Sequence, residues 1–305
     1  MRQLQFGLAI LFLLQPLVLG APLQAQQVID FTNELDFDEP EAWAMKYFTS
    51  MSLLSSVGAV ETLEPGAVEL GFEAMQLPHL DTEQRTVGFG GLKEEDLNRS
   101  PASGRLRVRV GLPNRFSLTL GWVPPVEVEG LESNLLSLAI EKVLMERETW
   151  SLAIRAYGQT GKSKGDLTCQ AGGDERFEPG SAENPFGCRA PSNDEVTMEY
   201  YGVELVAAYQ LAGDRAPKLH FGISGNQLDM EFQVDALVFD FRDRSLLLAD
   251  GGTVSLSAGA TWRWRQKTRL GFEVFYSPLK VQRTGQSEDN DDLLHARASL
   301  RFRIR

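Results

Sequence analysis

The stretch from Gly104 to Trp122, GRLRVRVGLPNRFSLTLGW, alternates charged and aliphatic residues at its start. The charged positions are Arg105, Arg107 and Arg109, and the aliphatic positions between them are Leu106, Val108 and Val110. Because neighbouring side chains of an extended strand point to opposite faces, the arginines share one face and the aliphatic residues share the other. A soluble sheet buries such an aliphatic face, whereas a membrane-spanning sheet turns it toward lipid.

The same alternation, with a period of two residues, predicts strands along most of the chain. The predicted segments are 66–77, 104–111, 115–123, 134–145, 149–160, 197–210, 217–226, 253–265, 268–277 and 293–304. Their connections are short at 113–114, 146–148, 211–216 and 266–267, and long at 78–103, 124–133, 161–196, 227–252 and 278–292. Short and long connections therefore alternate, which is typical of an antiparallel meander whose two rims face different compartments.

One face of these segments is free of charge, and its aromatic residues gather toward the strand ends, as in the aromatic girdles of membrane barrels. The opposite face carries many charges. The charged residues of this face are Arg105, Arg107, Arg109, Arg155, Arg263, Arg297, Arg301, Arg303, Glu69, Glu73, Glu141, Glu204 and Glu273. An unpaired charge in an apolar core costs several kcal/mol, so this face predicts a polar lumen containing an ion network. A secreted soluble β-sandwich is the alternative, and the uncharged faces and the sorted loops disfavour it.

The first residues have the order of a secretory signal peptide. Arg2 precedes an apolar run from Leu8 to Leu14, and Ala25 is a suitable cleavage position. The run is too short for a membrane-spanning helix, which needs about 20 residues. We therefore expect a signal peptide at 1–25, a periplasmic N-terminal segment at 26–65 and a barrel domain at 66–305.

From the signal peptide to the last alternating segment, the chain resembles bacterial outer-membrane β-barrel proteins as a general class. The resemblance implies an all-β fold, namely a closed, antiparallel, up-and-down transmembrane barrel of about ten strands in contact with outer-membrane lipid. It also implies short periplasmic turns and long outward loops, and with an even number of strands we expect both chain ends at the short-turn, periplasmic rim. One feature departs from the class: such barrels usually end their last strand on an aromatic residue, whereas this chain ends SLRFRIR, at Arg305.

Cys169 and Cys188 are the two cysteines of the chain, and an even pair in an exported protein predicts a disulfide. Closing a loop of about 20 residues contributes on the order of 3 kcal/mol to stability. There is no C-x-x-C motif and the three histidines are scattered, so we expect no metal and no cofactor. The formal net charge of −12 also argues against a nucleic-acid partner.

The segment 26–65 predicts a helix that begins near Pro40, includes Lys46 and stops before Gly58. Its acidic residues are Asp30, Glu34, Asp36, Asp38, Glu39, Glu41, Glu61 and Glu64. Because the predicted lumen has more arginines than glutamates, we expect this acidic segment to fold against or into the periplasmic mouth and occlude it as a plug. A disordered tail is the alternative.

A ten-stranded barrel has a narrow lumen, because eight strands are filled by their own side chains and sixteen leave an aqueous channel. The sequence therefore favours a narrow or gated pore for small, anionic solutes rather than an enzyme. A surface-binding or envelope-structural barrel acting through the loop 161–196 is the alternative. A hydrolase at the outer rim is a third possibility, with His79, Asp81, His295 and the acids from Asp289 as its candidate residues.

Overall fold

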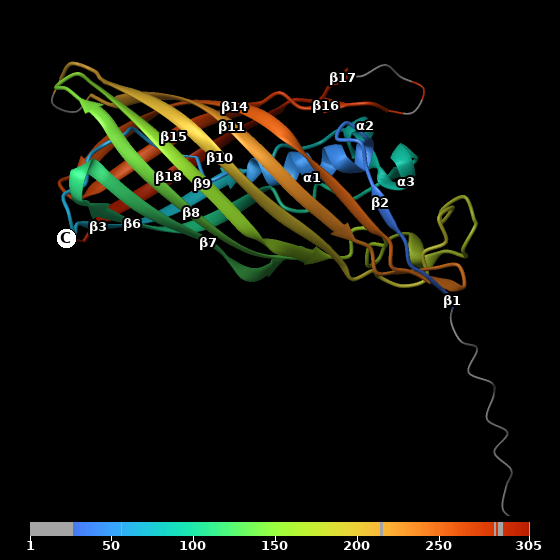
Figure 1. Ribbon diagram of the computed structural model, residues 1–305. Helices are drawn as coiled ribbons and strands as arrows, with labels where there is room; N and C mark the ends of the chain where they lie inside the picture. The colour runs from blue at the N-terminus through green and yellow to red at the C-terminus, as the bar shows by residue number, and fades with distance from the viewer. Residues whose placement is uncertain (1–26, 56, 214–215, 284, 286–288, 305) are drawn as a thin grey trace, which may run out of the picture.

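The computed structural model describes residues 27–55, 57–213, 216–283, 285 and 289–304, so the predicted signal peptide and Arg305 lie outside the described residues. Ten long antiparallel strands pair in chain order and close into a barrel through the pairing of the last strand with the first (Figure 1). They are β3 (Val68–Gln76), β6 (Ala102–Leu112), β7 (Phe116–Val128), β8 (Leu131–Glu146), β9 (Trp150–Gly165), β10 (Asp194–Gln210), β11 (Lys218–Gln233), β14 (Leu246–Arg265), β15 (Thr268–Ser277) and β18 (Leu293–Arg303). The predicted up-and-down barrel is confirmed.

One connection differs from the prediction: residues 124–133 do not form a long loop. Strand β7 continues to Val128 and β8 begins at Leu131, so only Glu129 and Gly130 form the turn, both with positive φ. The two prolines of this stretch lie where the pairing of β7 with β8 shifts register, between Val123 and Val126. A proline at such an irregularity does not remove a ladder hydrogen bond, so the strand passes through it.

The outer surface of the barrel is apolar and the inner surface is polar, as the alternation predicts. Outward-facing side chains are exposed on strand after strand; examples are Leu70, Leu120, Leu138, Val203, Phe221 and Val274. Such a continuous apolar band around a closed sheet is the surface that a transmembrane barrel presents to lipid. Within the described part of the chain, no helix has the length and apolarity needed to cross a membrane.

The rim with the long loops carries several small elements. They are β1 (Gln27–Ile29), β2 (Thr32–Glu34), α2 (Thr82–Arg85), β4 (Thr86–Val87), α3 (Gly88–Gly91), β5 (Lys93–Glu94), η2 (Asp174–Arg176), β12 (Ala236–Val238), β13 (Phe241–Asp243), β16 (Lys280–Val281) and β17 (Asp289–Asn290). The opposite rim has short turns, including the single helical turn η1 (Pro113–Arg115). The predicted disulfide between Cys169 and Cys188 is confirmed, and it packs against β12.

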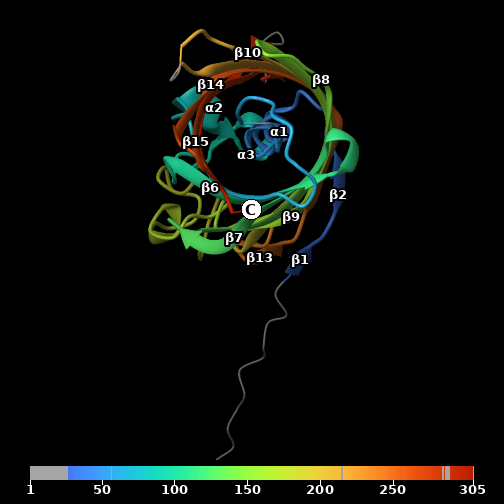
Figure 2. The ribbon, with the colours of Figure 1, turned by 90° about the vertical axis from the view of Figure 1, so that its left-hand side faces the viewer.

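Helix α1 (Pro40–Met51) lies inside the barrel, as the view along the barrel shows (Figure 2). Proline occupies its first turn as predicted, but the helix ends at Met51, well before Gly58. It lies toward the long-loop end rather than at the short-turn mouth where the charge argument placed this segment. Trp43 Nε1 donates to the carbonyl oxygen of Asp291 at 3.1 Å, and Lys46 Nζ donates to that of Lys280 at 2.8 Å. Both partners belong to the long loop between β15 and β18.

After α1, residues 52–63 run through the barrel interior to the short-turn rim, where the chain enters β3. We call these residues the luminal segment; Ser56 within it lies outside the described residues. The first described residue, Gln27, consequently lies at the long-loop rim, and the last, Ile304, lies at the opposite rim (Figure 1). The expectation that both chain ends share the short-turn rim is therefore wrong for the N-terminal end.

Candidate functional site

The barrel lumen brings the alternating charges of neighbouring strands into register. Glu73 is paired across the sheet with Arg105. The closest ion pair of Glu73 is diagonal, with Arg107 Nη2 2.5 Å from its Oε2. Farther toward the short-turn rim, Arg109 Nη2 lies 2.5 Å from Glu141 Oε1. Opposite charges at these spacings stabilise each other, so the lumen wall pairs these carboxylates with arginines.

Twelve of the thirteen predicted lumen residues lie on the inner wall and are buried or half-buried. Arg263 differs from them in being exposed near the short-turn rim, and its part in a lumen network stays a prediction. Arg269 is a wall residue that the prediction omitted; it is buried and lies 2.5 Å from Glu61 and 3.5 Å from Glu69. Arg269 shares its strand face with Glu273, so the alternation of β15 itself contained the signal.

The part of the luminal segment that follows α1 is held by hydrogen-bond donors from the barrel wall. Arg297 donates to the carbonyl oxygens of Met51 at 3.1 Å and Leu53 at 3.0 Å, and to Ser55 Oγ at 2.7 Å. Arg105 donates to the carbonyl oxygen of Ser52. The last carbonyls of a helix have no partner within it and carry partial negative charge, so guanidinium groups are well suited to bind them.

Tyr200 on β10 both donates and accepts a hydrogen bond with the same part of the luminal segment. Its hydroxyl donates to the carbonyl oxygen of Ser52 at 2.9 Å and accepts from the amide of Leu54 at 2.8 Å. Gln159 Nε2 adds a bond to Ser52 Oγ at 2.8 Å. Sequence reasoning missed these residues as a group, because neutral polar side chains on an inner face do not reveal which backbone atoms they bind.

The rest of the luminal segment, as far as the short-turn rim, is held in the same manner. Arg107 donates to the carbonyl oxygen of Ser55 at 2.9 Å, and Arg109 donates to that of Glu61 at 3.0 Å. From the other side of the barrel, Lys218 Nζ donates to the carbonyl oxygen of Val60 at 2.7 Å. The segment is thus bound along its described length by side chains that belong to several strands.

Gly58 shows how closely the segment passes the wall. Its φ of +127° lies in the region that other residues rarely adopt. A Cβ at this position would also lie 2.6 Å from Nη2 of Arg301. The segment can therefore pass Arg301 in this conformation only with glycine at position 58.

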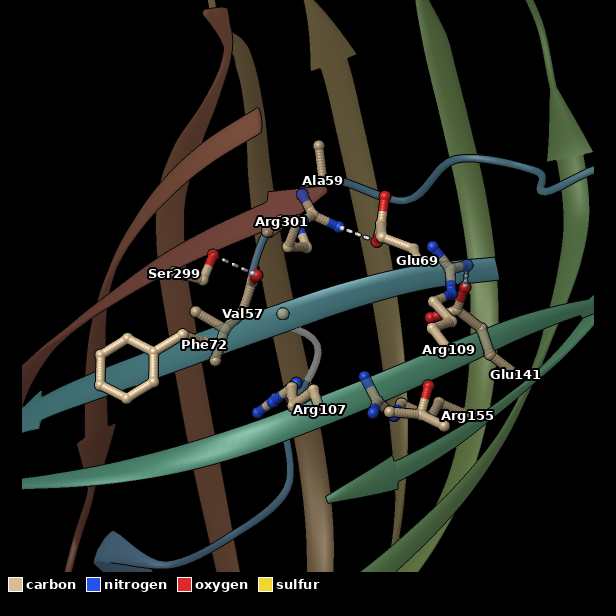
Figure 3. A pocket seen from close by; sticks show the side chains of 13 residues that line it. Val57, Ala59, Glu69, Phe72, Arg107, Arg109, Glu141, Arg155, Ser299 and Arg301 are labelled. Carbon is tan, nitrogen blue, oxygen red and sulfur yellow. Dashed lines mark hydrogen bonds and ion pairs between the residues drawn. The ribbon is translucent and has the colours of Figure 1, made fainter. Parts of the chain in front are cut away.

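Little space remains beside the luminal segment. A cavity of about 30 Å³ lies in the lower lumen between the segment and the wall, with Arg107, Arg155 and Arg301 among its lining residues (Figure 3). This volume suffices for about one or two water molecules. The chain's own N-terminal segment therefore occupies the described lumen, with charged side chains around this residual space.

A second group of polar residues lies above the lumen, in the loop between β3 and β6. Lys93 Nζ lies 2.6 Å from Glu95 Oε2. Burial raises the pKa of Glu95 to about 7, in spite of the lowering effect of Lys93. Glu95 also packs directly on Gly88, where an added Cβ would lie 2.0 Å from its Oε1. We call the loop 77–101 the outer cap, and the Glu95 carboxyl group is a titratable group within it.

The candidate hydrolase residues have other contacts. Asp81 accepts a hydrogen bond from the amide of Gln84 at 2.9 Å as the cap of α2. His295 is buried and its Nε2 accepts from Nε of Arg297 at 3.2 Å. Within the described residues no hydrogen bond joins His79 to His295. A hydrolase site at the outer rim stays an untested prediction.

Solved structures similar to this chain are bacterial outer-membrane barrels. The attachment invasion locus protein Ail of Yersinia pestis is 10% identical, with 79% of this chain and 99% of that chain covered at a TM-score of 0.31. The outer membrane protease OmpT from Escherichia coli is 8% identical, with coverages of 78% and 94% and a TM-score of 0.33. The Pseudomonas putida toluene transporter TodX is 9% identical, with coverages of 88% and 71% and a TM-score of 0.32.

No protein-family model matches the chain, and no curated protein matches its sequence. The class follows instead from the closed barrel, its apolar outer band and its polar, charge-paired interior. The chain is a ten-stranded outer-membrane β-barrel protein whose N-terminal segment lies inside its own lumen.

Proposed function

We propose that this protein is a gated pore for small anionic solutes, held closed by the luminal segment. The observation that carries the proposal is the binding of the segment's backbone carbonyls by arginines of the wall, such as Arg105, Arg107 and Arg297. These contacts fill the positive lumen with weakly negative backbone groups. Opening requires the segment to leave these donors, which then face water and solute.

The charge of the wall supports anions as the conducted species. The arginines that face the lumen are Arg105, Arg107, Arg109, Arg155, Arg269, Arg297, Arg301 and Arg303, and the glutamates are Glu69, Glu73, Glu141, Glu204 and Glu273. The arginines outnumber the glutamates, and a narrow low-dielectric passage concentrates the field of this excess. An opened lumen therefore attracts anions and repels cations.

A reversible cross-link tests the gate. Ala59 and Thr261 are adjacent, because the amide of Ala59 donates to Oγ1 of Thr261 at 2.8 Å. In planar bilayers we expect the oxidised double variant Ala59→Cys/Thr261→Cys to show no openings, and reductant to restore them. The single variant Ala59→Cys and the wild-type protein, each with and without reductant, control for reduction of the Cys169–Cys188 disulfide.

Deletion of residues 27–60 provides the complementary measurement. The truncated barrel is expected to conduct more than the intact protein and to prefer chloride over potassium. A matched deletion of residues 27–35 removes β1 and β2 but keeps α1 and the luminal segment, so its conductance should stay low. A cross-linked protein that conducts like wild type, or a truncated barrel that prefers cations, contradicts the gated anion pore.

A surface-binding barrel is the second candidate, and the ordered outer rim favours it. The disulfide-tied loop is held against β12, and Phe89 stacks on Phe186 with ring centroids 4.9 Å apart while staying 43% exposed. Exposed aromatic residues on a rigid support are frequent anchors in protein interfaces. If neither the wild-type protein nor the deletion variant conducts, this candidate replaces the pore.

A further inference from the structure

A second, apolar cavity of about 130 Å³ lies at the long-loop end of the barrel, above the charged lumen. One wall is helix α1, through Ala44, Met45 and Phe48. The facing wall is formed by Val196 and Met198 at the outer end of β10. The cavity therefore lies between the internal helix and the barrel wall, apart from the arginine network that holds the luminal segment.

The lining makes this cavity a poor site for water. Phe232, Leu131, Leu167, Val87 and Leu97 complete its apolar surface. An ordered water needs two to four polar partners, and apolar cavities without them stay dry. The three carboxylates among its lining residues have partners of their own: Glu95 is bonded to Lys93, Glu41 accepts from the amide of Gly90, and Asp96 accepts from Gln170.

The volume indicates the size of the occupant. Apolar cavities of about 150 Å³ accommodate one benzene molecule. We propose that this cavity binds a small, neutral, apolar molecule, namely a single aromatic ring or a hydrocarbon of similar size. Such a ligand regains the dispersion contacts that the lining side chains lack while the cavity is empty.

An adjoining cavity of about 290 Å³ provides the approach from the outer rim. It shares Glu41, Gly88, Glu95, Thr168 and Phe232 with the apolar cavity. Its lining extends to aromatic residues of the rim, which include Phe31 and Phe89. Both of these side chains are about half-exposed, so the path begins at the surface. The shared carboxylates disfavour anionic ligands here, so this site selects a different chemical class from the anions proposed for the lumen.

Binding of fluorobenzene, followed by ¹⁹F NMR, tests the site directly. The full-length protein is placed in lipid nanodiscs, and empty nanodiscs measure partition of the probe into lipid. We expect saturable broadening of the probe resonance with the wild-type protein beyond the lipid background. We expect 4-fluorobenzoate, which has the same ring and a negative charge, to bind at least about tenfold more weakly.

Matched substitutions locate the binding. Ala44→Phe places a ring in the cavity and should abolish saturable binding, whereas Ala207→Phe adds the same ring on the lipid-facing surface and should leave it unchanged. Met198→Trp fills the cavity from the facing wall and replaces A44F if that variant does not fold. Binding indistinguishable from empty nanodiscs, or saturable binding that survives both filling substitutions, overturns the proposal. Because the readout is binding, its result is independent of whether the lumen conducts.

Discussion

Arg297 on β18 donates a hydrogen bond of 3.0 Å to the carbonyl oxygen of Leu53, and both side chains are essentially inaccessible to solvent. The bond joins the barrel wall to the segment that fills it, across 244 positions of the chain. The same guanidinium binds Met51 and Ser55, so one side chain holds the junction between α1 and the luminal segment.

Replacing this guanidinium should destabilise the barrel and loosen the segment. Arg297→Met leaves the carbonyls of Met51 and Leu53 without this donor and removes a buried positive charge that interacts with Glu73 and Glu273. The loss of one partner of a buried charge pair costs about 3–5 kcal/mol. Urea unfolding in liposomes, followed by tryptophan fluorescence, measures the change. The exposed Arg263→Met is the control, with an expected change within about 0.5 kcal/mol. Equal stabilities of the two variants would contradict the structural role of Arg297.

Gly58→Ala should weaken closure of the lumen. The added Cβ meets Arg301 Nη2 at 2.6 Å, and the residue must keep a φ of +127°. Gly66→Ala also places an alanine at a positive φ, of +81°, but its Cβ meets nothing within 4 Å, so it controls for a positive-φ alanine outside the lumen. Single-channel recording should show more frequent openings in G58A than in G66A. The same opening frequency in both variants would refute the close passage beside Arg301.

The lipid-facing surface predicts a depth-dependent cost for charge. Leu120→Arg, in the middle of β7, should destabilise the folded barrel by about 2–4 kcal/mol, because the charge enters the centre of the bilayer. Val128→Arg, at the outer end of the same strand, should cost only about 0–1 kcal/mol. Equilibrium folding into lipid vesicles measures both. A cost for Leu120→Arg as small as that for Val128→Arg would mean that Leu120 does not face the centre of the bilayer.

Glu95 predicts a pH dependence of the outer cap. Its folded-state pKa of about 7 lies above the ordinary value of 4.5, so the folded cap binds the proton more tightly than the unfolded chain does. Its contribution to stability is present at low pH and is lost as pH rises from about 4.5 through about 7. Hydrogen exchange of residues 88–97, corrected for intrinsic rates, should show more opening at pH 8 than at pH 5. Glu95→Gln should remove this difference, and its persistence would assign the effect to another group.

The path of the chain predicts opposite locations for its two ends. Because α1 and Gln27 lie at the long-loop rim, an epitope tag inserted before Gln27 should be accessible to antibody on intact cells. A tag after Arg305 should become accessible only after the outer membrane is permeabilised. The reverse pattern would show that the long loops face the periplasm.

The strand faces, the disulfide and all of the long and short connections except that at 124–133 could be predicted from the sequence. Each depends on a local rule: alternation along one strand, turn length between two strands, or an even pair of cysteines in an exported chain. Even Arg269 obeyed the alternation of its strand. Arg263 is exposed, because it lies near the rim, where an inward direction does not bring burial.

The path of residues 52–63 was decided by the tertiary structure alone. The charge argument placed the acidic segment at the short-turn mouth, where Glu61 does lie 2.5 Å from Arg269. It did not place α1 toward the long-loop end, since it considered net charge and ignored hydrogen bonds. The decisive partners are backbone carbonyls, as in the bonds from Arg105 to Ser52 and from Arg297 to Leu53, and every residue has such a carbonyl. Because a backbone carbonyl is present in every type of residue, the sequence does not reveal which carbonyls are bound. Only a closed barrel, which brings donors from strands far apart in the chain around one axis, determines which carbonyls they bind.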